Sequence, residues 1–265
     1  MRSLPPPPGG GSSLAVAIND SDDVVGYVII SANGYAAFWP KGGGLELVGQ
    51  IISSASGIND RGEVIGTQSA NGAEHAFVWS KATGKRDLYT PLRSYFTIPT
   101  GINHSGDICG ITEDTATYLE HSLLWAQTGT IDLGTLPGGT FSYATAINNL
   151  DEVVGYGDSG TTYYEGYLWN GASGMQDLGS LDGSGSIALA VNDLSQVVGY
   201  APLISIGSHA FVWSKDAGIQ DLNNLIDPSS GWVLTSASGI NTNGQIIGVG
   251  TFNQLVHSYL LTPKN

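Results

Sequence analysis

The chain has little charge. Only 12% of its 265 residues are Asp, Glu, Lys or Arg, roughly half the share in an average domain. Just nine are Lys or Arg against 23 Asp or Glu, which gives a formal net charge of −14 at pH 7. Because so acidic a chain repels a phosphate backbone, we expect no nucleic-acid partner.

Cysteine and long apolar runs are also scarce. The single Cys109 excludes an internal disulfide, and the redox compartment stays open because a disulfide-free domain can function inside or outside a cell. No run of about 18 apolar residues is present, so we expect no membrane span. The first residues, MRSLPPPPGGGSS, lack the apolar centre of a signal peptide, so either the protein is cytoplasmic or a leader has been removed.

Glycine is abundant, with 38 residues, and it punctuates a repeat that runs along the whole chain. The first half of the repeat begins with AVAINDSDDVVGY at Ala15 and recurs at Ala55, Pro99, Ala144, Ala188 and Ala237. The second half begins with YAAFW at Tyr35 and recurs at His75, His121, Glu165, His209 and His257. We expect one domain, 1–265, with repeats near 15–54, 55–98, 99–143, 144–187, 188–236, and 237–265 plus 2–7.

Each half-repeat consists of two short β-rich stretches around a polar turn, the pattern of a hairpin. Two hairpins make four strands, which we name A to D, and four strands in about 44 residues is typical of a propeller blade. The sequence therefore predicts an all-β chain forming a single six-bladed β-propeller with four antiparallel strands per blade.

The sixth repeat lacks strand D after Leu261. Aligning the N-terminus with the third repeat places Arg2–Pro7 over its strand D, Ile131–Leu136. We therefore expect Arg2, Ser3 and Leu4 to pair with the strand at 257–261 and to close the last blade, which would remove the free edge of the ring. Prolines 5–8 weaken this strand because proline donates no ladder hydrogen bond.

Four histidines share one repeat position, and an aspartate follows in strand D. Equivalent positions on different blades lie far apart, whereas metal ligands lie about 2 Å from one ion, so we expect no shared metal site. A hydrogen bond from His to Asp or to backbone within each blade explains the His and Asp pattern. The repeated Trp residues are explained by packing between blades. These structural positions are His75, His121, His209, His257, Asp87, Asp132, Asp177 and Asp221.

Cofactors find little support in the sequence. Asp20, Asp22 and Asp23 cluster in one turn, but the pattern lacks the glycine and terminal glutamate of a defined calcium loop. We expect no cofactor, with calcium at such turns as the alternative that stays open.

Function is expected where the repeats differ, because irregular loops carry binding sites. The D–A segments at 89–98 and 223–235 and the longer B–C loops of repeats three and four fall on the face that propellers use for ligands. Trp232, the one Trp outside the repeat register, is either part of this face or a plug that shields the channel or a blade gap. The candidate ligand-binding residues are Arg93, Tyr95, Phe96, Glu113, Asp158, Tyr163, Tyr164 and Trp232.

Catalytic motifs are missing: there is no Gly-x-Ser-x-Gly, no His-Glu-x-x-His and no phosphate-binding glycine loop. Acidic residues could supply a pair for glycoside hydrolysis, for example Glu113 with Asp158, but the sequence does not fix their separation.

The repeated His-Ala-Phe with a following Trp, the segment DLGTLPGGTFSYATAIN at 132–148, and the ending DLNNLIDPSSGWVLTSASGINTNGQIIGVG with HSYLLTP resemble the HAF-repeat family of bacterial proteins over essentially the full chain. The resemblance implies an extracellular repeat protein, although neither the family's export signal nor its C-terminal sorting tail is present. It implies no activity and no catalytic residues.

Three functions remain. The first is a monomeric extracellular binding or adhesion module that presents one loop face to a carbohydrate or protein partner. The second is an enzyme, a polysaccharide lyase or hydrolase or a small-metabolite enzyme, with its site over the central channel. The third is a purely structural repeat protein. The absence of catalytic motifs favours the first and disfavours an enzyme.

Overall fold

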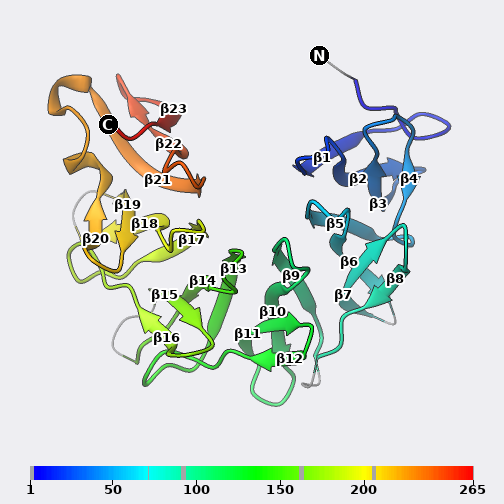
Figure 1. The fold of residues 1–265 in the computed structure, drawn as a ribbon, viewed down its shortest axis with the longest axis horizontal. Coiled ribbons are helices and arrows are strands. Elements are labelled where there is room, and N and C mark those ends of the chain that lie inside the picture. The colour runs from blue at the N-terminus through cyan, green and yellow to red at the C-terminus, as the bar shows by residue number, and fades with distance from the viewer. Residues whose placement is uncertain (1–2, 71, 91–93, 161–163, 205–206, 265) are drawn as a thin grey trace. The chain divides into compact units, whose positions relative to one another are not determined.

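The chain folds into six antiparallel β-sheets joined in sequence order (Figure 1). The structure is a computed structural model that describes residues 3–70, 72–90, 94–160, 164–204 and 207–264. The chain forms two compact units, Met1–Asp132 and Leu133–Asn265, with three sheets each. In these ranges no α-helix occurs, and so no helix is long and apolar enough to cross a membrane.

The first unit contains three four-stranded sheets, and in each the strands pair in chain order. The first sheet comprises β1 (Ser13–Ile18), β2 (Val24–Ile30), β3 (Asn33–Trp39) and β4 (Glu46–Leu47). The second comprises β5 (Ser53–Ile58), β6 (Val64–Ala70), β7 (Ala73–Ser80) and β8 (Gly84–Asp87). The third comprises β9 (Thr97–Ile102), β10 (Ile108–Asp114), β11 (Leu119–Ala126) and β12 (Gly129–Asp132).

The second unit continues the pattern with sheets four, five and six. The fourth comprises β13 (Ser142–Ile147), β14 (Val153–Gly157), β15 (Glu165–Asn170) and β16 (Gly174–Asp177). The fifth comprises β17 (Ile187–Val191), β18 (Val197–Leu203), β19 (Gly207–Ser214) and β20 (Gly218–Asp221). After two short 3₁₀ turns, η1 (Leu222–Asn224) and η2 (Pro228–Ser230), the sixth comprises β21 (Trp232–Ile240), β22 (Ile246–Phe252) and β23 (Leu255–Leu261).

The predicted all-β chain with repeated antiparallel four-stranded sheets is confirmed for five of the six repeats. The sixth sheet has three strands, so the predicted pairing of the N-terminus with β23 is absent from the structure. Ser3 and Leu4 form no strand, and Arg2 lies outside the described residues. Prolines 5–8 lack the N–H groups that a ladder needs. The segment instead contacts the first sheet, where the Trp39 indole donates to Pro5 O at 3.0 Å.

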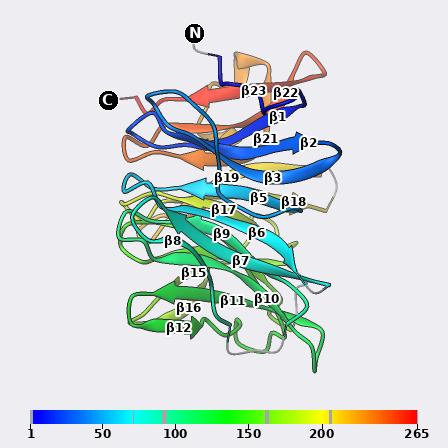
Figure 2. The ribbon, with the colours of Figure 1, turned by 90° about the vertical axis from the view of Figure 1, so that its right-hand side faces the viewer.

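Neighbouring sheets within a unit pack face to face, and Figure 2 shows the first unit's three sheets stacked in order. We call the side of a sheet that faces the next repeat its forward face and the other side its backward face. Ile65, Ala76 and Val78 on the forward face of the second sheet pack against Ile108 and Leu123 on the backward face of the third. Burial of such apolar faces is the main stabilising contribution to the fold.

The same repeat positions form each interface because side chains alternate between the two faces of a strand. The first and second sheets meet through Val25, Ala36, Phe38, Ala55, Val64 and Phe77. The fourth and fifth meet through Val154, Leu168, Leu178, Ala188, Val197 and Phe211. The fifth and sixth meet through Val198, Ala210, Leu222, Leu234, Ala237 and Tyr259.

The glycine of the recurring Val-Val-Gly segment is required by a close approach between strands A and B. Strand A has a register shift at this level, for example between Ala55 and Gly57 in β5. A Cβ atom added at Gly66 would lie far inside van der Waals contact with the carbonyl oxygen of Ser54. A residue with a side chain would therefore separate the two strands.

An asparagine opens each A–B turn, and four of these asparagines bond both to their own turn and to the next sheet. Asn192 Oδ1 accepts the N–H groups of Leu194 and Gln196, both at 3.0 Å. The sequence predicted this local role. Its amide group also donates to the carbonyl oxygen of Asn241, the equivalent residue one sheet on, at 3.0 Å. The same 3.0 Å bond joins Asn19 to Asn59, Asn59 to Asn103, and Asn148 to Asn192.

The asparagine bonds between sheets can be tested by comparing Asn192→Ala with Asn241→Ala. Both variants lose the turn hydrogen bonds, but only Asn192 donates to a following asparagine, while the Asn241 amide donates to Gln245 within its own turn. We expect Asn192→Ala to lower the free energy of unfolding by about 0.5–1.5 kcal/mol more than Asn241→Ala, since only Asn192→Ala removes a hydrogen bond between two sheets. Urea denaturation measures the difference, and equal losses would show that the bond contributes nothing.

Candidate functional site

The candidate ligand-binding residues divide between the two units. Tyr95, Phe96 and Glu113 belong to the first unit, whereas Asp158, Tyr164 and Trp232 belong to the second. Arg93 and Tyr163 lie outside the described residues. Neither unit by itself therefore contains the whole predicted surface, nor the suggested carboxylate pair of Glu113 with Asp158.

In the first unit, two exposed tyrosines stack at the loop end of the third sheet. Tyr95 precedes β9 and is 56% exposed, while Tyr118 lies in the β10–β11 loop and is 67% exposed. Their ring centroids are 6.5 Å apart with an angle of 15° between the ring planes. The pair presents a flat apolar surface to solvent.

The backbone of Tyr118 is strained. Its φ of 57° lies in the left-handed region, where a bulky side chain is disfavoured. The turn is fixed by the Tyr118 N–H, which donates to Asp114 O at 2.7 Å. A strained residue whose ring is exposed gains little from burial, and such strain is concentrated at functional sites.

Two glutamates lie on the strands that flank the loop of Tyr118. Glu113 and Glu120 are direct partners across β10 and β11. Partial burial and the charge of Glu113 raise the pKa of Glu120. The N–H of Glu113 donates to the carbonyl oxygen of Phe96, the residue after Tyr95. The loop end of the third sheet thus combines stacked aromatic rings with carboxylate hydrogen-bond acceptors.

In the second unit, Tyr164 belongs to a larger aromatic cluster. Its ring meets those of Phe141 and Tyr156 edge to face, at centroid distances of 6.3 and 5.5 Å. Tyr143 stacks on Tyr156 at 5.1 Å. Burial raises the pKa of Tyr200, and Tyr164 adds to this effect. This cluster is more buried than the Tyr95–Tyr118 pair, and Tyr164 is its exposed member.

Asp158 supports its loop. Its carboxylate accepts the N–H groups of Thr140 and Phe141 and the Thr140 hydroxyl, at 2.6 to 3.0 Å. Burial alone would raise the pKa of Asp158, but these hydrogen bonds prevail and lower it. The loop before β13 therefore depends on Asp158.

Trp232 is used in packing. Its half-buried ring stacks on Phe252 at 5.4 Å and meets His257 and Tyr259 edge to face. It contributes to the apolar interface between the fifth and sixth sheets. Trp232 therefore contributes to the packing of these two sheets.

The aromatic pairs follow a rule that the sequence analysis missed. A ring from the segment that enters strand A contacts a ring from the B–C end of the same sheet. The pairs are Tyr95 with Tyr118, Phe141 with Tyr164, and Trp232 with Phe252. The sequence does carry a signal for them: one aromatic residue at or just before the start of strand A, and another at the end of strand B or between it and the start of strand C of the same repeat.

The repeated His and Asp meet in some sheets only. His209 Nδ1 lies 2.6 Å from Asp221 Oδ2, and His121 Nδ1 lies 3.2 Å from Asp132 Oδ2. In the second sheet Asp87 instead contacts other partners, the Gln68 amide and the Lys85 ammonium, at 3.2 and 3.4 Å. Asp177 accepts the N–H of Gly179, and His257 contacts the rings of Trp232 and Phe252.

In the described ranges we find neither a metal-binding cluster nor a reactive thiol. These ranges contain no group of three or more His, Cys, Asp or Glu placed to hold an ion. In the acidic turn that suggested calcium, Asp22 forms an ion pair with Lys41 at 2.9 Å, and Asp23 accepts the Lys41 N–H. Burial raises the pKa of the Cys109 thiol to about 12, so it is a poor nucleophile near neutral pH.

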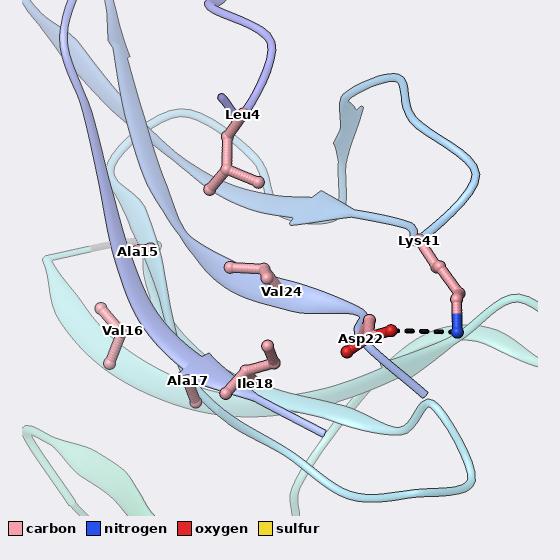
Figure 3. A pocket seen from close by; sticks show the side chains of 8 residues that line it. All are labelled: Leu4, Ala15, Val16, Ala17, Ile18, Asp22, Val24 and Lys41. Carbon is pink, nitrogen blue, oxygen red and sulfur yellow. Dashed lines mark ion pairs between the residues drawn. The ribbon is translucent and has the colours of Figure 1, made fainter. Parts of the chain in front are cut away.

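A hollow of about 760 Å³ lies on the backward face of the first sheet (Figure 3). Its lining is mostly apolar and includes Leu4, Ala15, Ile18 and Val24, with the Asp22–Lys41 ion pair to one side. Ala15 is exposed, whereas its equivalents in four other repeats are buried: Ala55, Ala144, Ala188 and Ala237. The hollow is thus a packing face that no preceding sheet covers within its unit.

The histidine position offers a matched test, His209→Ala beside His75→Ala. Burial raises the pKa of Asp221, but hydrogen bonds from His209 and Asn223 outweigh it and lower the pKa overall. We expect His209→Ala to cost about 1–3 kcal/mol of unfolding free energy near neutral pH. His75→Ala should cost less, because Asp87 keeps its Gln68 and Lys85 partners.

The pH dependence of this difference follows from the direction of the Asp221 shift. A depressed carboxyl pKa stabilises the fold above its unfolded value, and this contribution is lost as pH falls from about 4 through the lower folded value. Urea denaturation at several pH values measures the gap between the two variants. A gap that persists unchanged at low pH would contradict the pairing.

Solved structures with similar folds are β-propellers. The β-propeller domain of the Trilobed protease from Pyrococcus furiosus has a TM-score of 0.61 and 9% identity, over 96% of this chain and 82% of that one. Virginiamycin B lyase from Staphylococcus aureus has a TM-score of 0.54 and 10% identity, over 96% and 89%. A prolyl endopeptidase has a TM-score of 0.65 and 10% identity, over 95% of this chain and 41% of that longer chain.

At these identities the likeness concerns the fold alone, and the chain has a β-propeller-like fold. No curated protein matches the sequence. The family described as "Protein of unknown function (DUF3466)" matches residues 49–256, from the end of the first repeat into the sixth. This chain therefore belongs to the DUF3466 family.

Proposed function

We propose that this protein is a binding module that presents its B–C loops and D–A segments to a carbohydrate. The observation that carries the proposal is the exposed stack of Tyr95 and Tyr118, in which Tyr118 is held in a strained backbone conformation. Aromatic faces suit the apolar faces of sugar rings. Large exposed apolar groups that contribute little to the core mark interaction sites.

The charge of the protein limits the class of glycan that it would bind. Glu113 and Glu120 supply hydrogen-bond acceptors for hydroxyl or amino groups beside the tyrosines. With a net charge of −14, the chain disfavours sulfated or carboxylated polysaccharides. The proposal is therefore a neutral or amino-bearing glycan. We propose an extracellular location on the resemblance to HAF-repeat proteins, and a monomeric state.

An enzyme is the second candidate, and one observation favours it. Glu113 and Glu120 are cross-strand neighbours, and the pKa of Glu120 is raised, as for the acid of a carboxylate pair. Glycoside hydrolysis uses two such groups. Binding is preferred because the sequence carries none of the common catalytic motifs.

We further propose that the six sheets form one closed propeller. The forward face of the sixth sheet carries Ile247, which is 52% exposed, whereas its equivalent Ile65 is fully buried in the second sheet. Leu260 is likewise exposed, and its equivalent Val78 is buried. The backward face of the first sheet is similarly uncovered, so each end sheet has the surface that the other lacks.

The N-terminal segment supports closure from within the first unit. On the third sheet, the Trp125 indole donates to the carbonyl oxygen of Tyr89, which follows Leu88 of the second sheet. On the first sheet, the Trp39 indole donates to Pro5 O, which follows Leu4. Leu4 and Pro5 therefore contact the first sheet as Leu88 and Tyr89, which follow strand D of the second repeat, contact the third sheet. The P. furiosus propeller is described as having an open velcro topology, which makes face packing without strand exchange the simplest form of closure here.

The carbohydrate proposal is tested on a glycan array with wild type, Tyr118→Ala and Tyr95→Ala. We expect saturable binding of a neutral or amino-bearing glycan, weakened at least about tenfold in both variants by loss of the stacking surface. Tyr89→Ala is the control, because Tyr89 is an exposed tyrosine of the same unit outside the pair. Glycan binding that all three variants retain in full would refute the site, and no binding by wild type would refute the proposal.

A further inference from the structure

A second cavity lies between the fifth and sixth sheets, away from the aromatic pairs. Its volume is about 520 Å³, within the range of small-molecule sites. Apolar walls come from Val212 and Leu222 of the fifth repeat and from Ile246 and Leu261 of the sixth sheet. Gly244, in the A–B turn of the sixth sheet, borders it.

This cavity has a counterpart in the other repeats, where a tryptophan fills it. The large residue near the end of strand C is Trp in five repeats, and Leu261 replaces it in the sixth. Trp125 packs against Val78 and Leu88 of the preceding repeat, and both of these are buried. Val212 and Leu222 occupy the same repeat positions as Val78 and Leu88.

The equivalent interfaces show how completely such walls enclose an indole. Trp125 is 6% exposed and Trp213, at the interface of the fourth and fifth sheets, is 5% exposed. Leu261 is smaller and only partly buried, so it leaves part of the same space unfilled. Side chains that line an unfilled space lose dispersion contacts on that side. A ligand of matching shape would restore these contacts.

The polar part of the lining determines the charge of the occupant. One acidic and one basic residue, Asp227 and Lys264, border the cavity, and their charges cancel. Gln196, Gln220 and Thr262 are neutral hydrogen-bonding groups. We propose that this cavity binds a neutral planar aromatic compound of about the size of indole.

The experiment uses indole itself as the probe, titrated into the full chain by calorimetry and followed by NMR. We expect one saturable site with a Kd of about 1 mM or tighter, a weak but measurable affinity. Leu261→Trp fills the cavity with the side chain of the other repeats, and should raise the melting temperature and weaken indole binding at least about tenfold.

Leu255→Trp is the matched control. Leu255 lies at the opposite end of β23 and is exposed, so this variant should bind indole as wild type does. Leu261→Phe is measured alongside, so that a folded filling variant is present even if Leu261→Trp does not fold. Conversely, Trp213→Leu should create the equivalent cavity one sheet earlier and add a second site.

The binding results for these variants either support the proposed site or overturn it. Loss of binding in the Leu261 variants with retention in Leu255→Trp supports the site. Absence of indole binding by wild type overturns it. Equal binding by wild type and by the folded Leu261 variants also overturns it, because the compound would then lie elsewhere.

Discussion

The structure depends on one contact, the packing, within each unit, of the forward face of one sheet against the backward face of the next. A four-stranded sheet of this size has two apolar faces and cannot bury either by itself. The same few positions supply the contact each time, with Val64, Phe77 and their equivalents on one side and Ile65, Ala76 and their equivalents on the other. The asparagine at four of the A–B turns adds a hydrogen bond to the same interface, which fixes the spacing of the sheets at that end.

Much of this architecture could be predicted because it repeats. The spacing of the Ile-Asn and Phe-x-Trp segments located the hairpins, and strand alternation indicated which residues face inward. The bonds between successive asparagines could not be predicted, because a turn residue that satisfies its own backbone gives no sign of a partner 44 residues away in the chain. The N-terminal segment was predicted to pair as a strand with 257–261, but it contacts Trp39 of the first sheet without forming a strand, since its prolines lack the donors a ladder requires.

The site was harder to predict for a related reason. The candidate binding residues lie in irregular loops, where no repeat gives the register, so the sequence singled out Tyr95 and Tyr164 without indicating which rings they contact. Asp158 and Trp232 were singled out because they depart from the repeat, and the structure adds that Asp158 holds a loop and that Trp232 packs between the fifth and sixth sheets. Departure from a repeat does not by itself distinguish a candidate ligand site from a packing contact. Leu261 is a departure of a third kind, since it removes a packing group and leaves a cavity.

The closure that we propose requires one interface type to serve all six sheets, including the two at the ends. Ile65→Ala and Ile247→Ala test it directly, because the two residues share a repeat position while Ile65 is buried and Ile247 is half exposed within its own unit. If the end sheets cover each other, both substitutions should lower the unfolding free energy by about 2–4 kcal/mol in urea denaturation. A loss for Ile247→Ala within about 0.5 kcal/mol, as at an ordinary surface position, beside a large loss for Ile65→Ala, would contradict it.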